Sequence, residues 1–476
     1  MSAAPWKKAE VVAACGGEVL SPGEAGVFSA IGIDSRRIAP ADLFVAIVGE
    51  VHDAHRFIDD VLAKGVRGLV IQADRAGGLP VAEWRREGIF CLAVADTTRA
   101  LGDLARHRRR GLAVSVAAVT GSNGKTTTRA MTAAVLSRRF SVLETSGNFN
   151  NQIGLPLTLF GLETRHRWAV LELGTNHPGE IRQLARICLP DVGAVTNIAP
   201  AHLEGLGSIE GVRLAKRELL EELNPGGTAV LNRDDANVAR MADEVDRRVV
   251  FYGRHPSADV RADDVRATGK GVAFRLHIDG RTERVQLRTP ARFMVVNALA
   301  AAAVGTVAGL SIEEIAGGLE DFVPVAGRLN ILELDDDIVV IDDTYNANPG
   351  SMKAALETLM ELSGRRRAVF VAGDMKELGP GERALHAEVG ALAARCGVDR
   401  IVVCGQFAED LAAGARSAGL APAAVTVAER EEIIAQIPQW LQPGDRVLIK
   451  GSRAMAMEAV VERLKERGGD RRPGKA

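Results

Sequence analysis

The chain of 476 residues is too long for one hydrophobic core, because single cores stop growing at roughly 250–300 residues. Hydrophobic residues make up 47% of it and charged residues 25%, which are globular proportions and exclude disordered and fibrous classes. The formal net charge of −2 gives no electrostatic sign of a nucleic-acid or anionic-membrane surface, so we expect neither as a partner.

Cysteine usage and the lack of a long apolar segment bear on location. The five cysteines are an odd number, lie far apart and form no C-x-x-C pair, which favours a reducing compartment. No window of about 18 uncharged apolar residues indicates a membrane span. We therefore expect a cytoplasmic protein without membrane insertion, and we expect it to act as a monomer.

The first of three predicted α/β domains covers residues 1–98. In it, the β-branched runs LFVAIVG and GLVIQA are typical of strands, and the stretch FIDDVLAKG is typical of a helix. We interpret this domain as a separate small α/β unit.

The second predicted domain covers residues 99–325. From Ala113 onward, short β-branched runs alternate with helical stretches, which indicates a parallel sheet covered by helices on both faces. Between about Val249 and Pro290, the runs VVFYGR, VAFRLHI and RVQLRT predict a small antiparallel appendage. The stretches FMVVNALAAAAVGTVAG and SIEEIAGGLEDF then predict two helices.

The third predicted domain covers residues 326–476 and follows a linker in FVPVAGR. The strand-like runs IVVIDDT, AVFVAGD, RIVVCG, AVTV and RVLIKGS alternate with helical stretches. This alternation predicts a doubly wound, Rossmann-like domain.

The segment GSNGKTTT follows an apolar strand and precedes a helix, as a phosphate-binding loop does, although two residues rather than four separate its glycines. Gly121 and Gly124 let backbone N–H groups approach phosphate, and the helix N-terminus adds a positive dipole end. Lys125 is placed to reach the β- and γ-phosphate oxygens, and Thr126 to bind Mg²⁺. The predicted nucleotide site consists of Gly121, Ser122, Asn123, Gly124, Lys125, Thr126 and Thr127.

Two further candidate metal ligands follow later strands. Glu172 ends the run WAVLELG, and His202 follows VTNIAPA. A carboxylate and a neutral imidazole both suit a divalent ion held beside phosphates at the carboxyl edge of a sheet. Considered alone, each is more typical of a loop residue or a satisfied core group.

Several longer segments carry a family resemblance. They are DSRRIAPADLFVAIVGEVHDAHRFI, VTGSNGKTTT, TSGNFNNQIGLPLTL, LELGTNHPGEI, TNIAPAHLEGLGSIEGVRLAKRE, GRLN, IDDTYNANPGSM, GDMKELG and VLIKGSRAM. In this order, over nearly the whole chain, they resemble the Mur ligase family of ATP-dependent amide-bond ligases. The resemblance implies a UDP-binding first domain, an ATP-binding second domain and a C-terminal domain that completes the site.

The resemblance implies catalytic roles for Lys125, Glu172, His202 and Lys216. The last of these matches a lysine that is carbamylated in the family, and Thr126 joins Glu172, His202 and this carbamate as ligands of Mg²⁺.

Three other residues match groups of the family that contact ATP. Asn297 matches an asparagine near adenine, and Arg328 and Asp343 match groups that reach the phosphate and the ribose. Without the resemblance, these residues and Lys216 would be interpreted as a helix-packing asparagine, surface charges and a solvated lysine.

The resemblance also implies three sets of substrate contacts. UDP would be bound by Asp34, Ser35 and Arg36. The muramoyl peptide would meet an Asn-rich loop that otherwise resembles a simple turn: Asn148, Asn150, Asn151 and Gln152. Substrate contacts in the third domain would come from Tyr345, Asn346, Asn348, Lys450, Ser452 and Arg453.

The YNANP segment matches the family member that joins D-alanyl-D-alanine to UDP-N-acetylmuramoyl-tripeptide through an acyl phosphate, giving the pentapeptide precursor of peptidoglycan. The DNPR motif of the diamino-acid-adding relative is absent. That relative, a folylpolyglutamate synthase and a non-catalytic nucleotide-binding regulator remain as alternatives. Two segments depart from the family pattern: Ala54 replaces a glycine in VHDAHRFI, and Ala291, Arg292 and Phe293 stand where Gly-Arg-His is common, beside the predicted adenine contact.

The stretch EGVRLAKRELLEEL bears on the role of Lys216. Helical spacing predicts Leu214, Leu219 and Leu220 near the inner face of this helix, with Lys216 at its edge. A protonated lysine beside metal cations would be unfavourable, whereas a carbamate reverses the charge and offers two oxygen ligands. We therefore predict that Lys216 is carbamylated.

Overall fold

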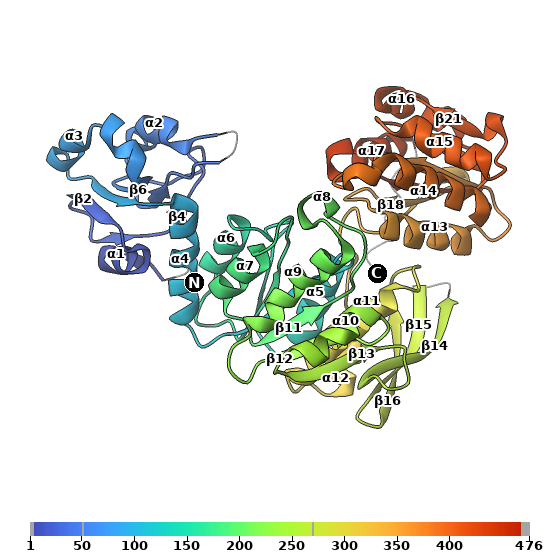
Figure 1. Cartoon of the computed structure of the whole chain (residues 1–476), viewed down its shortest axis with the longest axis horizontal. Helices are drawn as coiled ribbons and strands as arrows, with labels where there is room; N and C mark the ends of the chain where they lie inside the picture. Colours follow the sequence, from blue (N-terminus) through green and yellow to red (C-terminus); the bar gives the residue numbers. More distant parts are fainter. Residues whose placement is uncertain (1–3, 50–51, 269–270, 468–476) are drawn as a thin grey trace.

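The computed structural model describes residues 4–49, 52–268 and 271–467 and contains three α/β units in chain order. Figure 1 shows them side by side, from the blue N-terminal unit through the green and yellow central unit to the orange and red C-terminal unit. This arrangement confirms the predicted fold class. No helix in the described ranges is both long enough and apolar enough to cross a membrane.

The N-terminal unit is built on one five-stranded sheet. Its strands are β2 (Glu18–Pro22), β4 (Ile31–Gly32), β5 (Leu43–Val45), β6 (Gly68–Gln72) and β7 (Phe90–Val94). Their order is β2-β7-β6-β5-β4, and every neighbouring pair is parallel except β2 with β7. A separate antiparallel pair and three helices complete the unit: β1 (Trp6–Lys7), β3 (Val27–Phe28), α1 (Lys8–Cys15), α2 (Ile58–Ala63) and α3 (Val81–Arg86).

Helix α4 (Thr97–Arg110) joins the N-terminal unit to the central one. It begins because Asp96 caps its first turn, accepting the backbone N–H of Thr98 at 2.8 Å. Its Leu101 and Leu104 lie in the apolar core of the N-terminal unit, whereas its Ala105 lies in a core of the central unit. The predicted boundary after residue 98 therefore falls inside a helix that both units share.

The central unit contains a nine-stranded sheet. The strands are β8 (Ser115–Thr120), β9 (Val142–Glu144), β10 (Trp168–Glu172), β11 (Val192–Val195), β12 (Thr228–Asn232), β13 (Arg248–Gly253), β14 (Val260–Thr268), β15 (Gly271–Ile278) and β16 (Arg281–Leu287). The order is β16-β15-β14-β13-β12-β11-β8-β10-β9, with antiparallel pairs only among β14, β15 and β16.

The antiparallel appendage differs in detail from the prediction. It continues the main sheet, and the run VVFYGR forms β13, which pairs in parallel with β12 on one side and with β14 on the other. Strand β14 was not predicted, because its sequence VRADDVRAT is exposed along its second half and so lacks an apolar alternation.

Helices cover both faces of the parallel part of this sheet. They are α5 (Lys125–Ser137), α6 (Gly154–Phe160), α7 (Glu180–Cys188), α8 (Leu203–Leu206), α9 (Ile209–Glu221), α10 (Ala236–Ala239), α11 (Met294–Val307) and α12 (Ile312–Glu320). The two predicted helices after the appendage are thus confirmed as α11 and α12.

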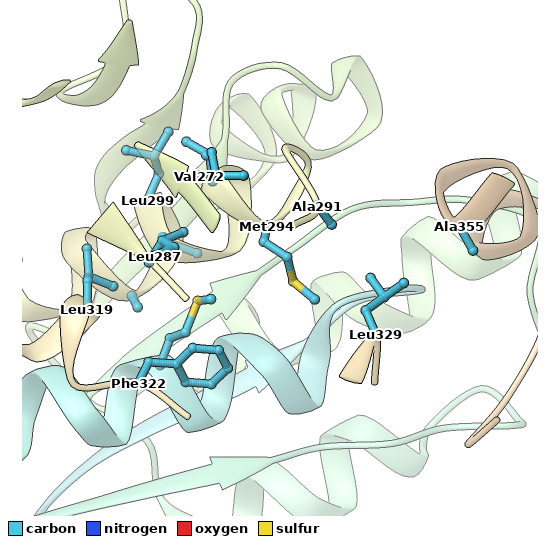
Figure 2. Packing of buried hydrophobic residues seen from close by; sticks show 14 of the residues in the cluster. Val272, Leu287, Ala291, Met294, Leu299, Leu319, Phe322, Leu329 and Ala355 are labelled. Carbon is cyan, nitrogen blue, oxygen red and sulfur yellow. The ribbon is translucent and has the colours of Figure 1, made fainter. Parts of the chain in front are cut away.

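An apolar cluster runs from the appendage through α11 toward the C-terminal unit. In Figure 2, Met294 of α11 points toward Leu329, while Leu287 of β16 lies near Leu299. The same cluster includes Ala355 in the C-terminal unit. The central and C-terminal units are therefore joined by apolar packing as well as by the polar contacts described below.

The C-terminal unit is a doubly wound domain, as predicted. Its strands are β17 (Asn330–Glu333), β18 (Val339–Asp343), β19 (Ala368–Ala372), β20 (Arg400–Val403), β21 (Val425–Val427) and β22 (Arg446–Lys450). Its helices are α13 (Pro349–Ser363), α14 (Glu382–Cys396), α15 (Ala408–Ser417), α16 (Arg430–Trp440) and α17 (Glu458–Arg467). The order is β17-β18-β22-β19-β20-β21, and only the unpredicted edge strand β17 is antiparallel.

Candidate active site

The predicted phosphate loop lies between β8 and α5, and its two glycines are required by its geometry. Gly121 has φ 148° and Gly124 has φ 78°, values that side chains disfavour. A Cβ atom on Gly121 would stand 1.8 Å from Oγ1 of Thr196, and one on Gly124 would stand 2.5 Å from Oδ1 of Asn297. Only glycine lets Thr196 and Asn297 approach this loop so closely.

Residues that follow β11, and that were not predicted as site residues, hold the loop in place. The backbone N–H of Asn123 donates to Oδ1 of Asn197 at 2.9 Å, and Oγ1 of Thr196 donates to the Asn123 carbonyl at 2.6 Å. Oγ of Ser122 donates to the carbonyl of Ala199 at 3.0 Å. The sequence signal was available, since these partners follow β11, the neighbour of β8 in the sheet.

Lys125 opens α5 and folds back on its own loop. Its Nζ donates to the carbonyl of Gly121 at 2.9 Å. Burial lowers the pKa of its ammonium group, whereas the nearby carboxylates of Glu172 and Glu377 raise it. Among the described residues, the hydrogen bonds of this Nζ go to loop carbonyls, so it is available to an arriving phosphate.

A cavity of about 440 Å³ separates the phosphate loop from the C-terminal unit. Its lining combines backbone, cationic, carboxylate and amide groups from both units. The lining residues are Ser122, Asn123, Gly124, Lys125, Thr126, Ala201, His202, Arg328, Asn346, Ala347, Asn348, Ser351, Lys376, Glu377, Leu378, Ser452, Arg453 and Ala454.

Polar contacts cross from the C-terminal unit to the phosphate loop. Nδ2 of Asn348, the N-cap of α13, donates to Oδ1 of Asn123 at 2.7 Å. Nη2 of Arg328 donates to Oγ1 of Thr126 at 3.3 Å, and the guanidinium lies 4.1 Å from the ring centre of Tyr345. The structure thus brings the predicted nucleotide residues against the predicted YNANP residues.

Glu172 ends β10 and is 3% exposed. Its Oε1 accepts Nδ2 of Asn150 at 2.8 Å, and its backbone N–H donates to Oγ1 of Thr145 at 3.1 Å. Its Oε2 is buried and has no hydrogen-bond partner. An anionic oxygen without a partner inside a protein is costly, so this atom is suited to a cation that arrives with the substrate.

His202 lies at the N-cap of α8 and makes a hydrogen bond across the cavity. Its Nδ1 lies 2.6 Å from Oε2 of Glu377 in the C-terminal unit. The hydrogen bond from His202 holds the pKa of the Glu377 carboxyl below its usual value. Glu377 was not predicted as a site residue, although it belongs to the quoted segment GDMKELG.

Lys216 departs from the predicted position on its helix. It is 1% exposed, whereas Leu214 is 40% exposed and points away from the core. The buried face of α9 repeats at three- and four-residue spacing through Val212, Lys216, Leu219 and Leu220. Burial lowers the pKa of Lys216 well below its usual value, and the charge of Lys125 adds to this effect.

Two predicted nucleotide residues lie behind the loop. Asn297 is 7% exposed, faces Gly124 and places its Nδ2 3.5 Å from the sulfur of Met294. Thr127 is 5% exposed in α5. Neither residue lines the 440 Å³ cavity.

Asp343, predicted at the nucleotide, and Lys450, predicted at the substrate, form a buried pair. Nζ of Lys450 donates to Oδ2 of Asp343 at 2.5 Å and to the carbonyl of Asn346 at 2.8 Å. The pair contacts the backbone of Asn346, which is one of the residues that line the cavity. Ser452 and Arg453 also line it, and the Ser452 hydroxyl is buried without a partner.

The predicted UDP residues lie in a different part of the molecule. Asp34 and Arg36 form an ion pair of 2.9 Å on an exposed turn after β4, and Lys64 donates to the Ser35 carbonyl at 2.6 Å. The hydrogen bond from Arg36 lowers the pKa of Asp34 to about 2. The structure does not bring this turn to the cavity that the phosphate loop lines.

The side chains of the Asn-rich loop make different contacts. Asn150 contacts Glu172, whereas Oδ1 of Asn151 accepts backbone N–H groups at the start of α6. Asn148 is exposed. Gln152 donates to Gln183 at 2.7 Å and lines a second cavity of about 520 Å³ between α4 and α7.

The departures from the family pattern lie outside the cavity lining. Ala291 is fully buried, Phe293 is 38% exposed at the start of α11, and Ala54 begins a short 3-10 turn. No lining residue of the 440 Å³ cavity is altered by them.

Comparison with known proteins agrees with this geometry. The pattern of the Mur ligase middle domain matches residues 119–305, and that of the Mur ligase, glutamate ligase domain matches residues 327–453. The UDP-N-acetylmuramoyl-tripeptide--D-alanyl-D-alanine ligase of Escherichia coli is 37% identical over 92% of this chain and 94% of its own length.

Two solved structures are similar over most of the chain. A crystal structure of MurF from Acinetobacter baumannii has a TM-score of 0.88 and 33% identity, covering 98% of this chain and 100% of the other. MurF ligase from Thermotoga maritima in complex with ADP has a TM-score of 0.79 and 27% identity, covering 92% and 97%. By sequence and by fold along nearly its whole length, the chain belongs to the Mur ligase family.

Proposed function

We propose that this chain is the ATP-dependent ligase that joins D-alanyl-D-alanine to UDP-N-acetylmuramoyl-tripeptide, forming the pentapeptide precursor of peptidoglycan. One observation carries the proposal: the phosphate loop and the YNANP segment face each other across one cavity and are joined by Asn123 and Asn348. The similar protein from Escherichia coli, a UDP-N-acetylmuramoyl-tripeptide--D-alanyl-D-alanine ligase, supports the same substrate class.

The reaction needs an activated carboxylate, because attack by an amine on a free carboxylate would have to expel oxide or hydroxide. The terminal carboxylate of the tripeptide attacks the γ-phosphorus of ATP, the bond to ADP breaks, and an acyl phosphate forms. The dipeptide amine then attacks the acyl carbon, loses a proton and expels phosphate. Catalysis of such a transfer is mainly positioning and neutralisation of charge.

Lys125 and the loop backbone supply most of the phosphate contacts in this proposal. When a phosphate occupies the loop, Nζ of Lys125 exchanges the Gly121 carbonyl for phosphate oxygens. Arg328, now on Thr126 Oγ1, lies close enough to add a second cation on the side of the C-terminal unit. Asn297 and Asp343 are proposed to act near the adenine and the ribose.

The residues around the cavity fit a magnesium ion. The orphaned Oε2 of Glu172, the hydroxyl of Thr126 and the free ring nitrogen of His202 are suitable ligands. In the described part of the chain, no three His, Cys, Asp or Glu side chains by themselves form a metal cluster, so the remaining ligands would be a carbamate and phosphate oxygens. When bound, Mg²⁺ neutralises charge on the phosphates and aligns them.

Lys216 supports the carbamate proposal through its burial. Lowering the pKa of an amine increases its neutral fraction, and the neutral amine attacks CO₂, forming an N–C bond and releasing a proton. The resulting anion faces Lys125, so two like charges become an opposite pair. Both its oxygens are hard donors of the kind that Mg²⁺ prefers.

The other substrate contacts remain proposals on the same basis. We propose that Asp34, Ser35 and Arg36 bind UDP, and that the Asn-rich loop meets the muramoyl peptide through Asn150 and its neighbours. We further propose that Tyr345, Asn346, Asn348, Lys450, Ser452 and Arg453 form the dipeptide side, with Lys450 acting by supporting Asn346. The three domains are proposed to be 1–98, 99–325 and 326–476, in a monomer of the cytoplasm.

The proposal is tested by phosphate release from ATP. Release is expected only when UDP-N-acetylmuramoyl-tripeptide and D-alanyl-D-alanine are both present, and mass spectrometry should detect the pentapeptide. Assaying the diaminopimelate- and lysine-containing tripeptides side by side identifies the third residue. Release with a free diamino acid or with glutamate in place of the dipeptide would favour the alternative ligases, and nucleotide binding without release would favour a regulator.

A further inference from the structure

Glu377 reaches the proposed metal site from another domain. It lies in the segment between β19 and α14 of the C-terminal unit, 175 positions from its partner in the central unit. Its Oε2 lies 2.6 Å from Nδ1 of His202, and both residues line the 440 Å³ cavity. Glu377 also interacts electrostatically with Lys125 of the phosphate loop.

Glu377 contacts Nδ1 of His202, and this determines which ring nitrogen is free to bind a metal. An ionised carboxylate only accepts hydrogen bonds, so the proton of the neutral imidazole must lie on Nδ1. The lone pair then lies on Nε2, which has no hydrogen-bond partner within the described residues. Metal-binding histidines generally donate their second ring N–H to a carboxylate or carbonyl, which fixes the ring and its tautomer.

Backbone conformation indicates that the contact is built into both units. His202 has φ 54° and Glu377 has φ 64°, in the left-handed region that residues with a Cβ seldom adopt. Such conformations persist where surrounding structure fixes them, and they gather at functional sites. Each residue is strained separately, in a different domain, and the two side chains still meet.

The surroundings of Glu377 do fix its segment. Asp374, which is 2% exposed, accepts the backbone N–H of Gln406 at 2.8 Å and of Phe407 at 3.0 Å. Nε2 of His386 accepts the backbone N–H of Met375 at 2.9 Å. The residues just before Glu377 are therefore held rigidly, and its carboxylate is presented at a set place on the cavity wall.

We propose that Glu377 is a positioning residue for the metal site: it fixes the ring and tautomer of His202, so that docking of the C-terminal domain completes the geometry for the divalent cation. This inference rests on the proposed metal role of His202. It gives domain closure a direct chemical consequence, because His202 is oriented by Glu377 only when the two units are together.

The test measures metal affinity rather than turnover. Mn²⁺, which reports its environment by electron paramagnetic resonance, is titrated into the full-length protein with a non-hydrolysable ATP analogue. Glu377→Ala is expected to weaken Mn²⁺ binding by roughly 10- to 100-fold, as loss of a carboxylate behind a metal-bound histidine does. Glu377→Gln keeps an acceptor oxygen without the charge and should give an intermediate affinity and a hyperfine spectrum nearer the wild type.

Two comparison variants separate orientation from docking and from folding. Asn348→Ser removes another cross-domain hydrogen bond, to Asn123, while keeping a helix-capping hydroxyl. Glu388→Ala removes an exposed carboxylate of α14 and should match the wild type in Mn²⁺ affinity and melting temperature. Equal weakening by Glu377→Ala and Asn348→Ser would show a docking effect and overturn the proposal.

The other possible results for Glu377→Ala and His202→Ala also decide between the proposals. Unchanged Mn²⁺ affinity in Glu377→Ala, with a loss in His202→Ala, would overturn the positioning role and leave the proposed ligase function intact. Unchanged affinity in both variants would overturn the metal role of His202 and the inference together. A loss in both, with partial recovery in Glu377→Gln, is the expected result.

Discussion

The central unit meets its two neighbours through contacts of different kinds. Toward the N-terminal unit, α4 is packed into apolar cores on both sides, and Trp6 lies edge-on to Phe160 of α6 at 5.7 Å. Toward the C-terminal unit, apolar packing around Met294 is accompanied by hydrogen bonds around a cavity. We refer to these as the N-terminal seam and the C-terminal seam.

The difference indicates which seam takes part in the chemistry. Apolar contacts at the N-terminal seam stabilise the protein only while they stay tightly packed, so we expect this seam to act mainly as a scaffold. Hydrogen bonds at the C-terminal seam can be exchanged for contacts with phosphate or metal at little net cost. Groups that bind the other domain in this structure are thus the groups proposed to bind substrates, and closure would exclude water from the acyl phosphate.

The largest expected effect comes from removing Lys125, the cationic side chain at the C-terminal seam that is proposed to bind the phosphates of ATP. Lys125→Ala should lower kcat by at least about 10²–10³-fold, because a lost preorganised charge at the transferring group has this scale. The protein should stay folded, since Nζ contacts only loop carbonyls. Phosphate release and circular dichroism check the two parts, and near-normal ligation by a folded variant would remove the loop from the mechanism.

A second prediction concerns the buried lysine behind the C-terminal seam. Lys216→Ala should lower activity by about 10- to 100-fold through loss of an anionic oxygen donor at the metal site. Short-chain carboxylates added to the assay should restore part of it by occupying the place of the carbamate. Full activity without supplement would contradict the ligand role, and loss without any rescue would favour a structural one.

A third prediction compares the seams directly. Asn348→Ser breaks one hydrogen bond at the C-terminal seam and should raise KM for ATP as well as for the dipeptide, by about 2- to 10-fold for one net hydrogen bond. Tyr345→Ala should raise KM for the dipeptide more than for ATP. A rise confined to ATP in both variants would contradict the dipeptide assignment.

The matched comparison for Asn348→Ser is a variant at the N-terminal seam. A Cβ at Gly102 would stand 2.8 Å from Cδ1 of Ile187 in α7, so Gly102→Val overfills that seam. The free energy of unfolding should fall by about 1–3 kcal/mol, with KM for ATP unchanged. Denaturant unfolding and steady-state kinetics measure both, and an altered KM for ATP would mean that this seam is not merely a scaffold.

The smallest expected effect is a pH-dependent gain in stability. Burial lowers the pKa of Lys216 in the folded state below its unfolded value of about 10.4, so the unfolded chain binds more protons between these two values. The contribution of Lys216 to the free energy of unfolding therefore rises with pH across that window, and this gain is lost as the pH falls through it. Lys216→Met removes this penalty.

In CO₂-free buffer, Lys216→Met should melt higher than the wild type by about 2–4 °C per kcal/mol relieved, with the gap narrowing as pH approaches 10. Added bicarbonate should raise the melting temperature of the wild type only, because CO₂ would bind its folded state. A gap that widens with pH would contradict the burial of an uncharged amine.

Much of the molecule follows from the sequence alone. The phosphate loop was predictable because strand, glycine turn, lysine and helix are contiguous, so local conformational preferences determine its shape. The doubly wound C-terminal domain was predictable because β-branched runs and helical stretches alternate regularly. Strand β14 was missed for the converse reason, since a half-exposed, charged strand has no such pattern.

Only the tertiary structure decided where Lys216 and Glu377 act. Helical spacing predicted Leu214 near the inner face of α9 and Lys216 at its edge, and this was wrong for both residues, because which face is buried depends on the sheet and helices packed against it. The contact between Glu377 and His202 joins residues of separate domains, and no local pattern encodes such a distance. Sequence determined the chemical groups of this protein, whereas packing between domains determined which of them meet.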